Sequence, residues 1–226
     1  MNRARTVGRD RAVGRDRAMS RDQAAWQAQS LLVAYPDGLA GHMPMLRRVA
    51  GALDRPVGAP MRRFLDHVCR TPAAGLAADY VATFDHHKRC CLFLTYYAHG
   101  DTRKRGMALL GLKQRYATAG LRLVGDELPD HLAVMLEYAA TAGPADGREL
   151  LTAHRAGLEL LRLALHDTGS PWAAVLDSVS ATLPPVTAAE RAAAARLATE
   201  GPPEEQVGLA PFAPPDYMPP PQGARR

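Results

Sequence analysis

The sequence is poor in cysteine and in aromatic residues, and it has no long apolar run. Only three of its 226 residues are cysteines, and two of these, Cys90 and Cys91, are adjacent. Such a sparse and odd set of thiols does not predict a disulfide framework, so a reducing cytoplasm is the simplest compartment. No stretch approaches the ~20 apolar residues of a membrane-spanning helix, and the polar N-terminus lacks the apolar core of a secretory signal. We therefore expect a cytoplasmic protein that is not embedded in a membrane.

The sequence motifs of common enzymes are absent as well. The chain contains no glycine-rich phosphate loop, no His-Glu-x-x-His and no Gly-x-Ser-x-Gly. A catalytic thiol would need a base and an orienting group beside it, and a single sequence does not locate such partners. The sequence thus gives no positive sign of an enzyme.

The net charge of +5 is concentrated near the N-terminus. Residues 1–22 contain seven arginines and three aspartates, which accounts for +4 of that charge. Within them the sequence Val-Gly-Arg-Asp-Arg-Ala occurs at 7–12 and again at 13–18, a unit too short for a structural repeat. We expect a disordered tail over residues 1–19. An Arg-rich arm that binds a nucleic acid is the alternative, although the nearly neutral remainder lacks the basic face that such binding needs.

The other end of the chain is rich in proline. Residues 202–226 contain eight prolines. Proline has no backbone N–H and interrupts both helix and sheet, so we expect an extended, disordered tail over 202–226. The residues between the tails, 20–201, are enough for one domain with a hydrophobic core.

This central part has apolar side chains at helical spacing and no sustained strand-like alternation. Ser20 with Gln23, and Thr187 with Glu190, have the spacing of capping boxes and mark a first and a last helix. The predicted fold class is all-α, a single-domain helical bundle between two disordered tails.

Three stretches set the expected limits of the inner helices. Pro60 is expected to open a short helix, and the apolar stripe from Leu150 to Leu165 predicts the longest unbroken one. A further stripe steps by four and three residues, the spacing of one buried helix face. This spacing fits one long helix, or two helices with a break between them. In the second case Asp85 is a candidate N-cap of the new helix. The members of this stripe are Tyr80, Phe84, His87, Cys91, Leu94 and Ala98.

His86, His87, Cys90 and Cys91 are residue types that bind zinc. On a helix, His86 shares a face with Cys90 and His87 with Cys91, but the two pairs lie about 100° apart around the axis. All four therefore cannot bind one ion, and a packed cysteine with a hydrogen-bonded histidine is the favoured interpretation. A metalloenzyme with a two-ligand site completed from elsewhere stays open as the alternative.

Three cations, Arg103, Lys104 and Arg105, occupy the expected first turn of a helix. The helix dipole disfavours cations there by roughly 0.3–1 kcal/mol each at exposed sites. Asp101 offsets part of this as the expected cap. The rest predicts either internal acidic partners or an acidic group on another molecule, and geometry slightly favours internal partners or plain solvation of the cations. The candidate partners are Asp85, Asp130 and Glu137.

The stretch Glu127-Leu128-Pro129-Asp130-His131 places a carboxylate beside an imidazole at a helix start. Such a pair could form a charge-assisted hydrogen bond. Spacing alone favours a simpler arrangement, in which Asp130 caps the helix and His131 lies at the surface.

These stretches together resemble the NarJ family of respiratory nitrate reductase assembly chaperones, a branch of the group that includes TorD and DmsD. The likeness is dense over about 80–140 and fainter over 26–79. It is most specific in the run Tyr-Tyr-x-x-Gly-Asp-Thr-Arg-x-Arg-Gly. The matching residues are Tyr80-Val81-Ala82-Thr83-Phe84-Asp85, Leu94-Thr95-Tyr96-Tyr97-Ala98-His99-Gly100-Asp101-Thr102-Arg103-Lys104-Arg105-Gly106-Met107-Ala108-Leu109 and Leu128-Pro129-Asp130-His131-Leu132.

The resemblance implies an all-helical, non-enzymatic chaperone that acts in the cytoplasm. It would bind the apo catalytic (alpha) subunit of nitrate reductase transiently, at its N-terminal segment. It would assist insertion of molybdenum bis-molybdopterin guanine dinucleotide without binding that cofactor stably. The alternative is a maturation chaperone whose client is another molybdoenzyme.

A chaperone of this kind needs a groove between helices with a polar rim. We expect Tyr96, Tyr97 and apolar neighbours to line it, while core packing with a hydrogen-bonded hydroxyl is an equal alternative for the tyrosines. Asp101 and the three cations would orient the client. The full set of expected partner-binding residues is Tyr80, Asp85, Tyr96, Tyr97, Asp101, Arg103, Lys104, Arg105, Asp130 and His131.

Overall fold

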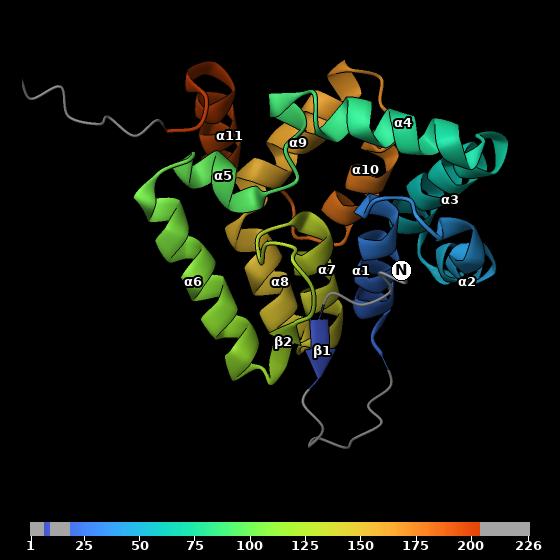
Figure 1. The fold of residues 1–226 in the computed structure, drawn as a ribbon, viewed down its shortest axis with the longest axis horizontal. Coiled ribbons are helices and arrows are strands. Elements are labelled where there is room, and N and C mark those ends of the chain that lie inside the picture. The colour runs from blue at the N-terminus through green and yellow to red at the C-terminus, as the bar shows by residue number, and fades with distance from the viewer. Residues whose placement is uncertain (1–6, 10–18, 204–226) are drawn as a thin grey trace, which may run out of the picture.

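The computed structural model describes residues 7–9 and 19–203, and helices dominate them (Figure 1). The longer helices are α1 (Arg21–Val33), α2 (Leu39–Ala52), α3 (Arg55–Arg70), α4 (Ala73–Phe84), α6 (Arg103–Thr118), α9 (Arg155–Asp167) and α11 (Ala188–Glu200). The shorter ones are η1 (Lys88–Cys90, a 3-10 turn), α5 (Leu94–His99), α7 (Leu132–Thr141), α8 (Pro144–Ala153) and α10 (Ala173–Ala181). The prediction of an all-helical single domain is confirmed.

The arrangement has a packed centre and two flanks. α1 packs against α7, and α10 packs against α3 and α9. In Figure 1, α2 and α3 lie at one edge of the molecule and α6 lies at the opposite edge. None of the helices in the described part of the chain is long and apolar enough to cross a membrane.

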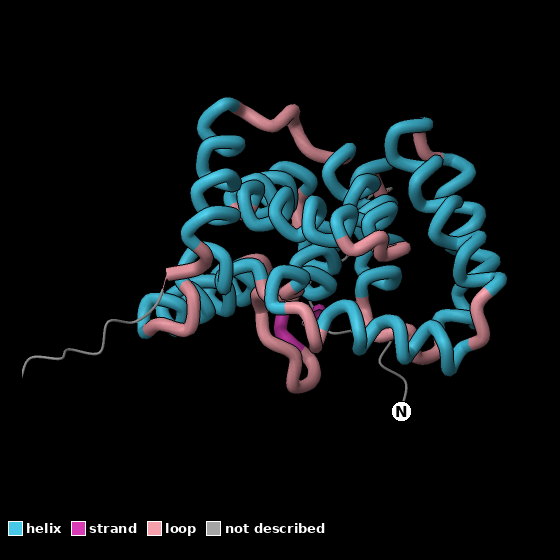
Figure 2. Tube along the Cα trace, turned by 90° about the horizontal axis from the view of Figure 1, so that it is seen from above, coloured by secondary structure: helices cyan, strands magenta, loops and turns pink. Residues whose placement is uncertain are grey.

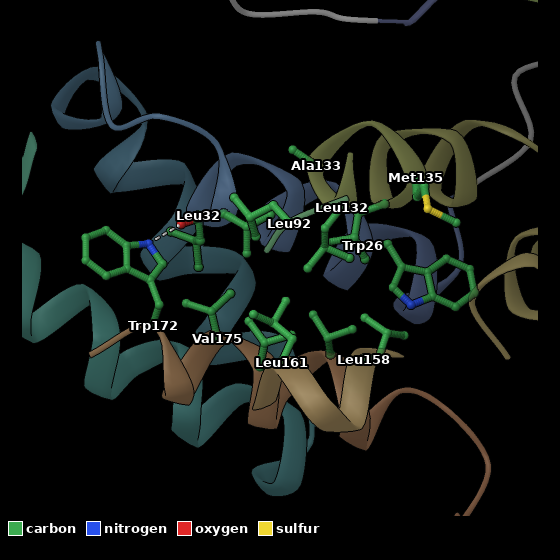
Figure 3. Close-up of a cluster of buried hydrophobic side chains, with 14 of the residues drawn as sticks. Trp26, Leu32, Leu92, Leu132, Ala133, Met135, Leu158, Leu161, Trp172 and Val175 are labelled. Atoms are coloured by element: carbon green, nitrogen blue, oxygen red, sulfur yellow. Dashed lines mark hydrogen bonds between the residues drawn. The ribbon is translucent and has the colours of Figure 1, made fainter. Parts of the chain in front are cut away.

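The core is one cluster of apolar side chains between two tryptophans (Figure 3). Trp26 on α1 and Trp172 before α10 are both fully buried. The indole of Trp26 donates to Thr182 Oγ1 at 2.9 Å, and that of Trp172 donates to the carbonyl of Leu32 at 3.1 Å. Because each buried N–H has an acceptor, the two large rings are buried without a desolvation penalty for an unpaired donor.

Helix ends follow the sequence where capping is local. Both predicted capping boxes are present, Ser20 with Gln23 on α1 and Thr187 with Glu190 on α11. In each box, the cap hydroxyl accepts a hydrogen bond from the backbone N–H three residues further on. The Gln or Glu side chain at that position accepts a hydrogen bond from the backbone N–H of the cap residue.

The segment between Tyr80 and Ala98 is broken, as one of the two alternatives had it. α4 ends at Phe84, and Asp85 is its C-cap rather than the N-cap of a new helix. The backbone after η1 is extended and pairs with a distant segment: Leu94 N–H donates to the carbonyl of Asp130 at 2.9 Å, and Leu132 N–H donates to that of Leu92 at 2.8 Å. These tertiary hydrogen bonds replace the helical ones that the spacing had suggested.

Two expected helix limits were wrong. Pro60 lies inside α3, and Pro56 occupies its first turn, where a missing N–H costs nothing. The stripe from Leu150 to Leu165 is divided at His154 into α8 and α9. His154 has φ −105° and ψ 18°, outside the helical region.

A two-stranded antiparallel ladder is the part of the described chain that helical periodicity did not predict. β1 (Val7–Arg9) pairs with β2 (Leu121–Leu123), with Gly8 opposite Arg122. Figure 2 shows the strand colour confined to this one short ladder. β1 lies within residues 1–19, for which the sequence predicts a disordered tail. The predictions for residues 1–6, 10–18 and 204–226 fall outside the described residues.

A close helix crossing generates a stability prediction. Gly147 on α8 is buried, and a Cβ there would lie 2.7 Å from the backbone of Ala139 on α7. Gly147→Ala should lower the free energy of unfolding by about 1–3 kcal/mol because the two helices must separate. The matched control is Gly111→Ala on α6, where nothing lies within 4 Å and a helical alanine should stabilise by ~0.5–1 kcal/mol. Urea unfolding measures both, and equal effects would contradict this packing.

Candidate partner-binding site

Arg105 is the centre of the cluster that the sequence singled out. It lies in the first turn of α6, and its side chain is 16% exposed. Its guanidinium donates to Asp101 Oδ1 at 2.8 Å and lies 3.5 Å from Asp130 Oδ2. The same group lies over the rings of Phe93 and Tyr96, 5.6 and 5.9 Å from their centroids. We call Phe93, Thr95, Tyr96, Asp101, Arg105 and Asp130 the Arg105 cluster.

Asp130 is the internal partner that the cations required. Its side chain is fully buried, and Thr95 donates a hydrogen bond to the same Oδ2 that faces Arg105. Arg105 Nε also contacts Thr95 Oγ1 at 3.4 Å. Of the three carboxylates considered, Asp130 therefore partners Arg105, while Asp85 is exposed at the end of α4. A buried carboxylate is tolerated only when a cation and hydrogen-bond donors face it.

The expected capping by Asp130, with His131 at the surface, was wrong. His131 is the N-cap of α7, and its Nδ1 accepts from the backbone N–H of Ala133 at 3.2 Å. The ring is buried and meets Phe93 edge-on at 5.3 Å. Burial lowers the pKa of His131 below its ordinary value, and the neutral ring supplies the acceptor that the helix start needs.

Asp101 was also expected to cap a helix and does not. The N-cap of α6 is Thr102, and its hydroxyl donates backward to the carbonyl of His99 at 2.8 Å. Asp101 instead pairs with Arg105 one turn further on. Through this ion pair with Arg105, the Asp101 carboxylate partly offsets the positive charge of the first turn of α6.

The tyrosines divide into core and surface. Tyr97 is buried and its hydroxyl donates to the carbonyls of Arg89 and Cys91, at 3.1 and 2.9 Å. Tyr80 is buried in an aromatic group with Phe84 and Trp172. Core packing with a hydrogen-bonded hydroxyl, the alternative left open for Tyr96 and Tyr97, describes Tyr97. The Tyr80 hydroxyl likewise donates to the carbonyl of Val33 at 3.1 Å. Tyr96 is half-buried beside Arg105 and keeps an exposed edge.

The structure thus brings together only part of the expected set. Tyr96, Asp101, Arg105, Asp130 and His131 meet where α5, α6 and α7 begin or end. Arg103 and Lys104 are exposed on the same first turn of α6. Tyr80 and Asp85 belong to α4 and its C-cap, in another part of the fold.

An exposed stripe on α6 is the feature that sequence reasoning missed. Its members step by four and three residues along one face, and all of them are exposed. Met107 is 69% and Leu110 is 47% exposed, whereas the buried residues of α6 are Leu112 and Tyr116 on the opposite face. The spacing was visible in the sequence but could not be told from that of a buried face. The α6 stripe consists of Arg103, Met107, Leu110, Gln114 and Ala117.

A hollow of about 540 Å³ adjoins the far end of this stripe. It lies between the last turns of α6 and the segment 120–129. Leu128, in its wall, and the neighbouring Val124 are 37% and 50% exposed. Exposed apolar side chains beside a concave surface are typical of a protein-interaction site.

The histidine and cysteine group does not assemble as helix geometry had assumed. The segment is a 3-10 turn, with Cys90 buried and His86 exposed. His87 Nδ1 lies 2.8 Å from the carbonyl of Ala82. Burial raises the pKa of the Cys90 and Cys91 thiols, which disfavours the thiolate that binds metal. Among the described residues there is no group of three or more metal-binding side chains.

The buried ion pair gives a stability prediction. Asp130→Ala leaves Arg105 and Thr95 facing an apolar gap, so it should lower the free energy of unfolding by about 3 kcal/mol or more. The control is Asp101→Ala, at the other partner of the same guanidinium, where the carboxylate is 78% exposed. This change should cost below about 1 kcal/mol. Chemical denaturation compares the two, and a larger loss for Asp101→Ala would contradict the assignment.

The buried His131 and the half-buried His154 predict an acid-sensitive fold. Burial lowers the pKa of His131 and of His154, so the unfolded chain binds more protons than the folded one near their ordinary pKa. Stability is therefore complete above about pH 6.5 and falls as the pH drops through the folded values. His154→Gln should flatten this fall, and His86→Gln, at an exposed position, should not. Thermal unfolding between pH 5 and 8 measures the slope; equal slopes in all variants would rule His154 out as a cause.

Comparison with known proteins supplies the family. Residues 50–177 match the model of the nitrate reductase delta subunit family. The chain is 34% identical over 157 residues to the nitrate reductase-like protein NarX of Mycobacterium tuberculosis, covering 70% of this chain but only 24% of that protein.

Two further relatives are named assembly chaperones. The probable nitrate reductase molybdenum cofactor assembly chaperone NarJ of Bacillus subtilis is 29% identical, with 70% of this chain and 87% of that protein aligned. The NarJ of Escherichia coli is 32% identical, with 66% and 64% aligned. The chain belongs to the nitrate reductase delta subunit family, a family of assembly chaperones rather than enzymes.

Proposed function

We propose that this protein is a cytoplasmic chaperone that binds the apo catalytic subunit of a respiratory nitrate reductase, at its N-terminal segment. It holds that subunit in a form that can receive molybdenum bis-molybdopterin guanine dinucleotide, and it then dissociates. The B. subtilis and E. coli relatives, which are named for this assembly step, support the client class. The cofactor is cargo for the client in this proposal, and no residue of the chaperone is assigned to hold it.

The observation that carries the proposal is the exposed α6 stripe. α6 has 16 residues, so its face is about 24 Å long, enough for four turns of an amphipathic client helix. Burying Met107 and Leu110 against a client stabilises the complex by roughly 1.5–3 kcal/mol for each side chain. A flexible methionine also adapts to an unfolded segment better than a branched side chain does.

The two ends of the α6 stripe differ in chemical character, so a client segment would bind in one orientation. Arg103 and Lys104 are exposed at its start and complement an acidic group on the client. The hollow at its far end, lined by Leu128 and by charged side chains such as Lys113 and Glu127, would accept a side chain of the client. Gly106 and Gly111, both exposed between these ends, allow a backbone to approach α6 closely.

The Arg105 cluster supports this surface from beneath. Arg105 already has Asp101, Asp130 and Thr95 as partners, so in this proposal it positions the first turn of α6. Tyr96 and Asp101, at the exposed margin of the cluster, keep their expected role as client contacts. Tyr80, Tyr97 and His131 act through the core.

The proposal also concerns which molybdoenzyme subunit is the client. The chain aligns with only about a quarter of the M. tuberculosis relative, which is named nitrate reductase-like. A related molybdoenzyme is therefore the second candidate client. The same surface would serve either one, because both need an N-terminal segment held away from the folding subunit.

Calorimetric titration tests the surface. A peptide with the N-terminal segment of the nitrate reductase alpha subunit from the same organism is titrated into the full chain. Met107→Ser with Leu110→Ser should weaken binding at least about tenfold, because both apolar contacts are lost. The matched control is Leu163→Ser on α9, a leucine with the same 47% exposure as Leu110.

Circular dichroism must show the same helical content in each variant, so that lost binding is not lost fold. Undiminished affinity of the double variant would remove the α6 stripe from the binding site. Absence of binding by the unaltered protein, to peptides from nitrate reductase and from related molybdoenzymes alike, would contradict the proposed function.

A further inference from the structure

The hairpin formed by α2 and α3 concentrates positive charge. Residues 39–70 contain six arginines and two aspartates, a net charge of +4, whereas residues 19–203 as a whole contain 20 basic and 18 acidic residues. The two helices lie at the edge of the molecule opposite α6 (Figure 1). This basic surface is therefore separate from the Arg105 cluster and from the α6 stripe.

Three of these arginines follow one face of α3, along its seam with α2. Arg55, Arg62 and Arg70 are separated by seven and eight residues, about two helical turns each, so they span about 22 Å. Arg62 marks the seam, because it donates to the carbonyl of Ala50 on α2 at 2.6 Å. A Cβ on the buried Gly58 would clash with the same carbonyl, so the two helices cross closely there. We call Arg55, Arg62 and Arg70 the α3 arginine row.

The row is poor in acidic partners within the chain. Among the described residues, the side chains of Arg55 and Arg70 have no hydrogen-bond or ion-pair partner, and both are exposed. Arg55 also occupies the first position of α3, where the helix dipole disfavours a cation. The two aspartates of the hairpin, Asp54 and Asp66, are paired with other arginines. These cations are therefore open to an acidic group of another molecule.

The surroundings of the row favour a protein partner over a membrane or a nucleic acid. None of the exposed large apolar side chains of the described residues lies on α2 or α3, so the hairpin offers no apolar anchor to a lipid bilayer. A continuous run of phosphates would meet the exposed Asp66, between Arg62 and Arg70 on the same face. Carboxylates placed two helical turns apart avoid Asp66. Each can also accept two N–H bonds from one guanidinium.

We propose that the α3 arginine row binds an acidic α-helix of a partner protein, with carboxylates at intervals of about seven residues. This helix lies along the seam between α2 and α3. Complementary charges contribute more to encounter and orientation than to affinity, so the complex is weak, salt-sensitive and quickly reversible. The site does not rest on the proposed function, and it can be occupied while the α6 stripe is occupied as well.

Fluorescence anisotropy with two labelled synthetic peptides tests this site. The first is an alanine-rich helix of about 22 residues with glutamates on one face, about seven residues apart. The second has the same composition, with its glutamates distributed around the helix. The full chain should bind the first peptide at least about fivefold more tightly, because only its carboxylates reach all three guanidiniums together. Binding should weaken as the salt concentration rises from about 20 to about 200 mM.

A pair of double variants locates the binding. Arg55→Gln with Arg70→Gln should weaken binding of the first peptide at least about fivefold, because two charge pairs are lost. The matched control is Arg191→Gln with Arg196→Gln, which removes the same charge at exposed positions of α11 and should change the affinity less than about twofold. Circular dichroism must show equal helical content in all proteins.

Three results would overturn the proposal. The first is absence of binding by the first peptide or equal binding of both peptides, and the second is an equal loss of affinity in the two double variants. The third comes from titrating vesicles of anionic phospholipid and a single-stranded oligonucleotide in parallel. Tighter binding of either one, lost in the Arg55 and Arg70 variant, would assign the row to that class of partner instead. None of these measurements uses the nitrate reductase peptide, so their outcome is independent of whether the proposed function holds.

Discussion

The ion pair between Arg105 and the buried Asp130 is the constraint on which the surface of this protein depends. It ties the first turn of α6 to the residue before the N-cap of α7. Without an internal carboxylate, three consecutive cations at a helix N-terminus would oppose the helix dipole. With it, one cation is turned inward, and Arg103 and Lys104 face outward.

The same place in the fold explains why α6 can expose an apolar face. Few residues of α6 are buried, so ordinary core packing holds it weakly. The hydrogen bonds of the Arg105 cluster at its start and the bond from Tyr116 to the carbonyl of Pro129 at 2.7 Å near its end hold it in place. A helix fixed at both ends can present Met107 and Leu110 to a partner without needing them for the fold.

The sequence predicted what depends on local rules. Helical periodicity gave the all-α class, and the Ser20 and Thr187 boxes gave two helix starts, because a cap is built from residues three apart. The conflict between the cations and the helix dipole indicated an internal acid. Choosing Asp130 required the hydrogen bonds that join Leu92 and Leu94 to residues 130–132, and no local spacing encodes that pairing.

Burial was the other quantity that spacing could not supply. Leu94 and Met107 both lie on helical stripes, but Leu94 is buried and Met107 is 69% exposed. The difference depends on which elements pack nearby: α9 packs against α5, whereas in the described part of the chain the main contacts of α6 are with β2 and α5. For this reason we place the proposed client contacts on the α6 stripe rather than at Tyr80 and Tyr97.

Site-specific photo-crosslinking shows which face of the chaperone contacts the client. A photo-reactive residue is placed at Gln114, in the middle of the α6 stripe, and in a second protein at Leu163 on α9. Each is co-expressed with the apo nitrate reductase alpha subunit and irradiated, and the crosslinked peptides are sequenced. We expect crosslinks from position 114 to the N-terminal segment of the alpha subunit and none from position 163. Crosslinks from 163 alone, or from both positions equally, would contradict this expectation.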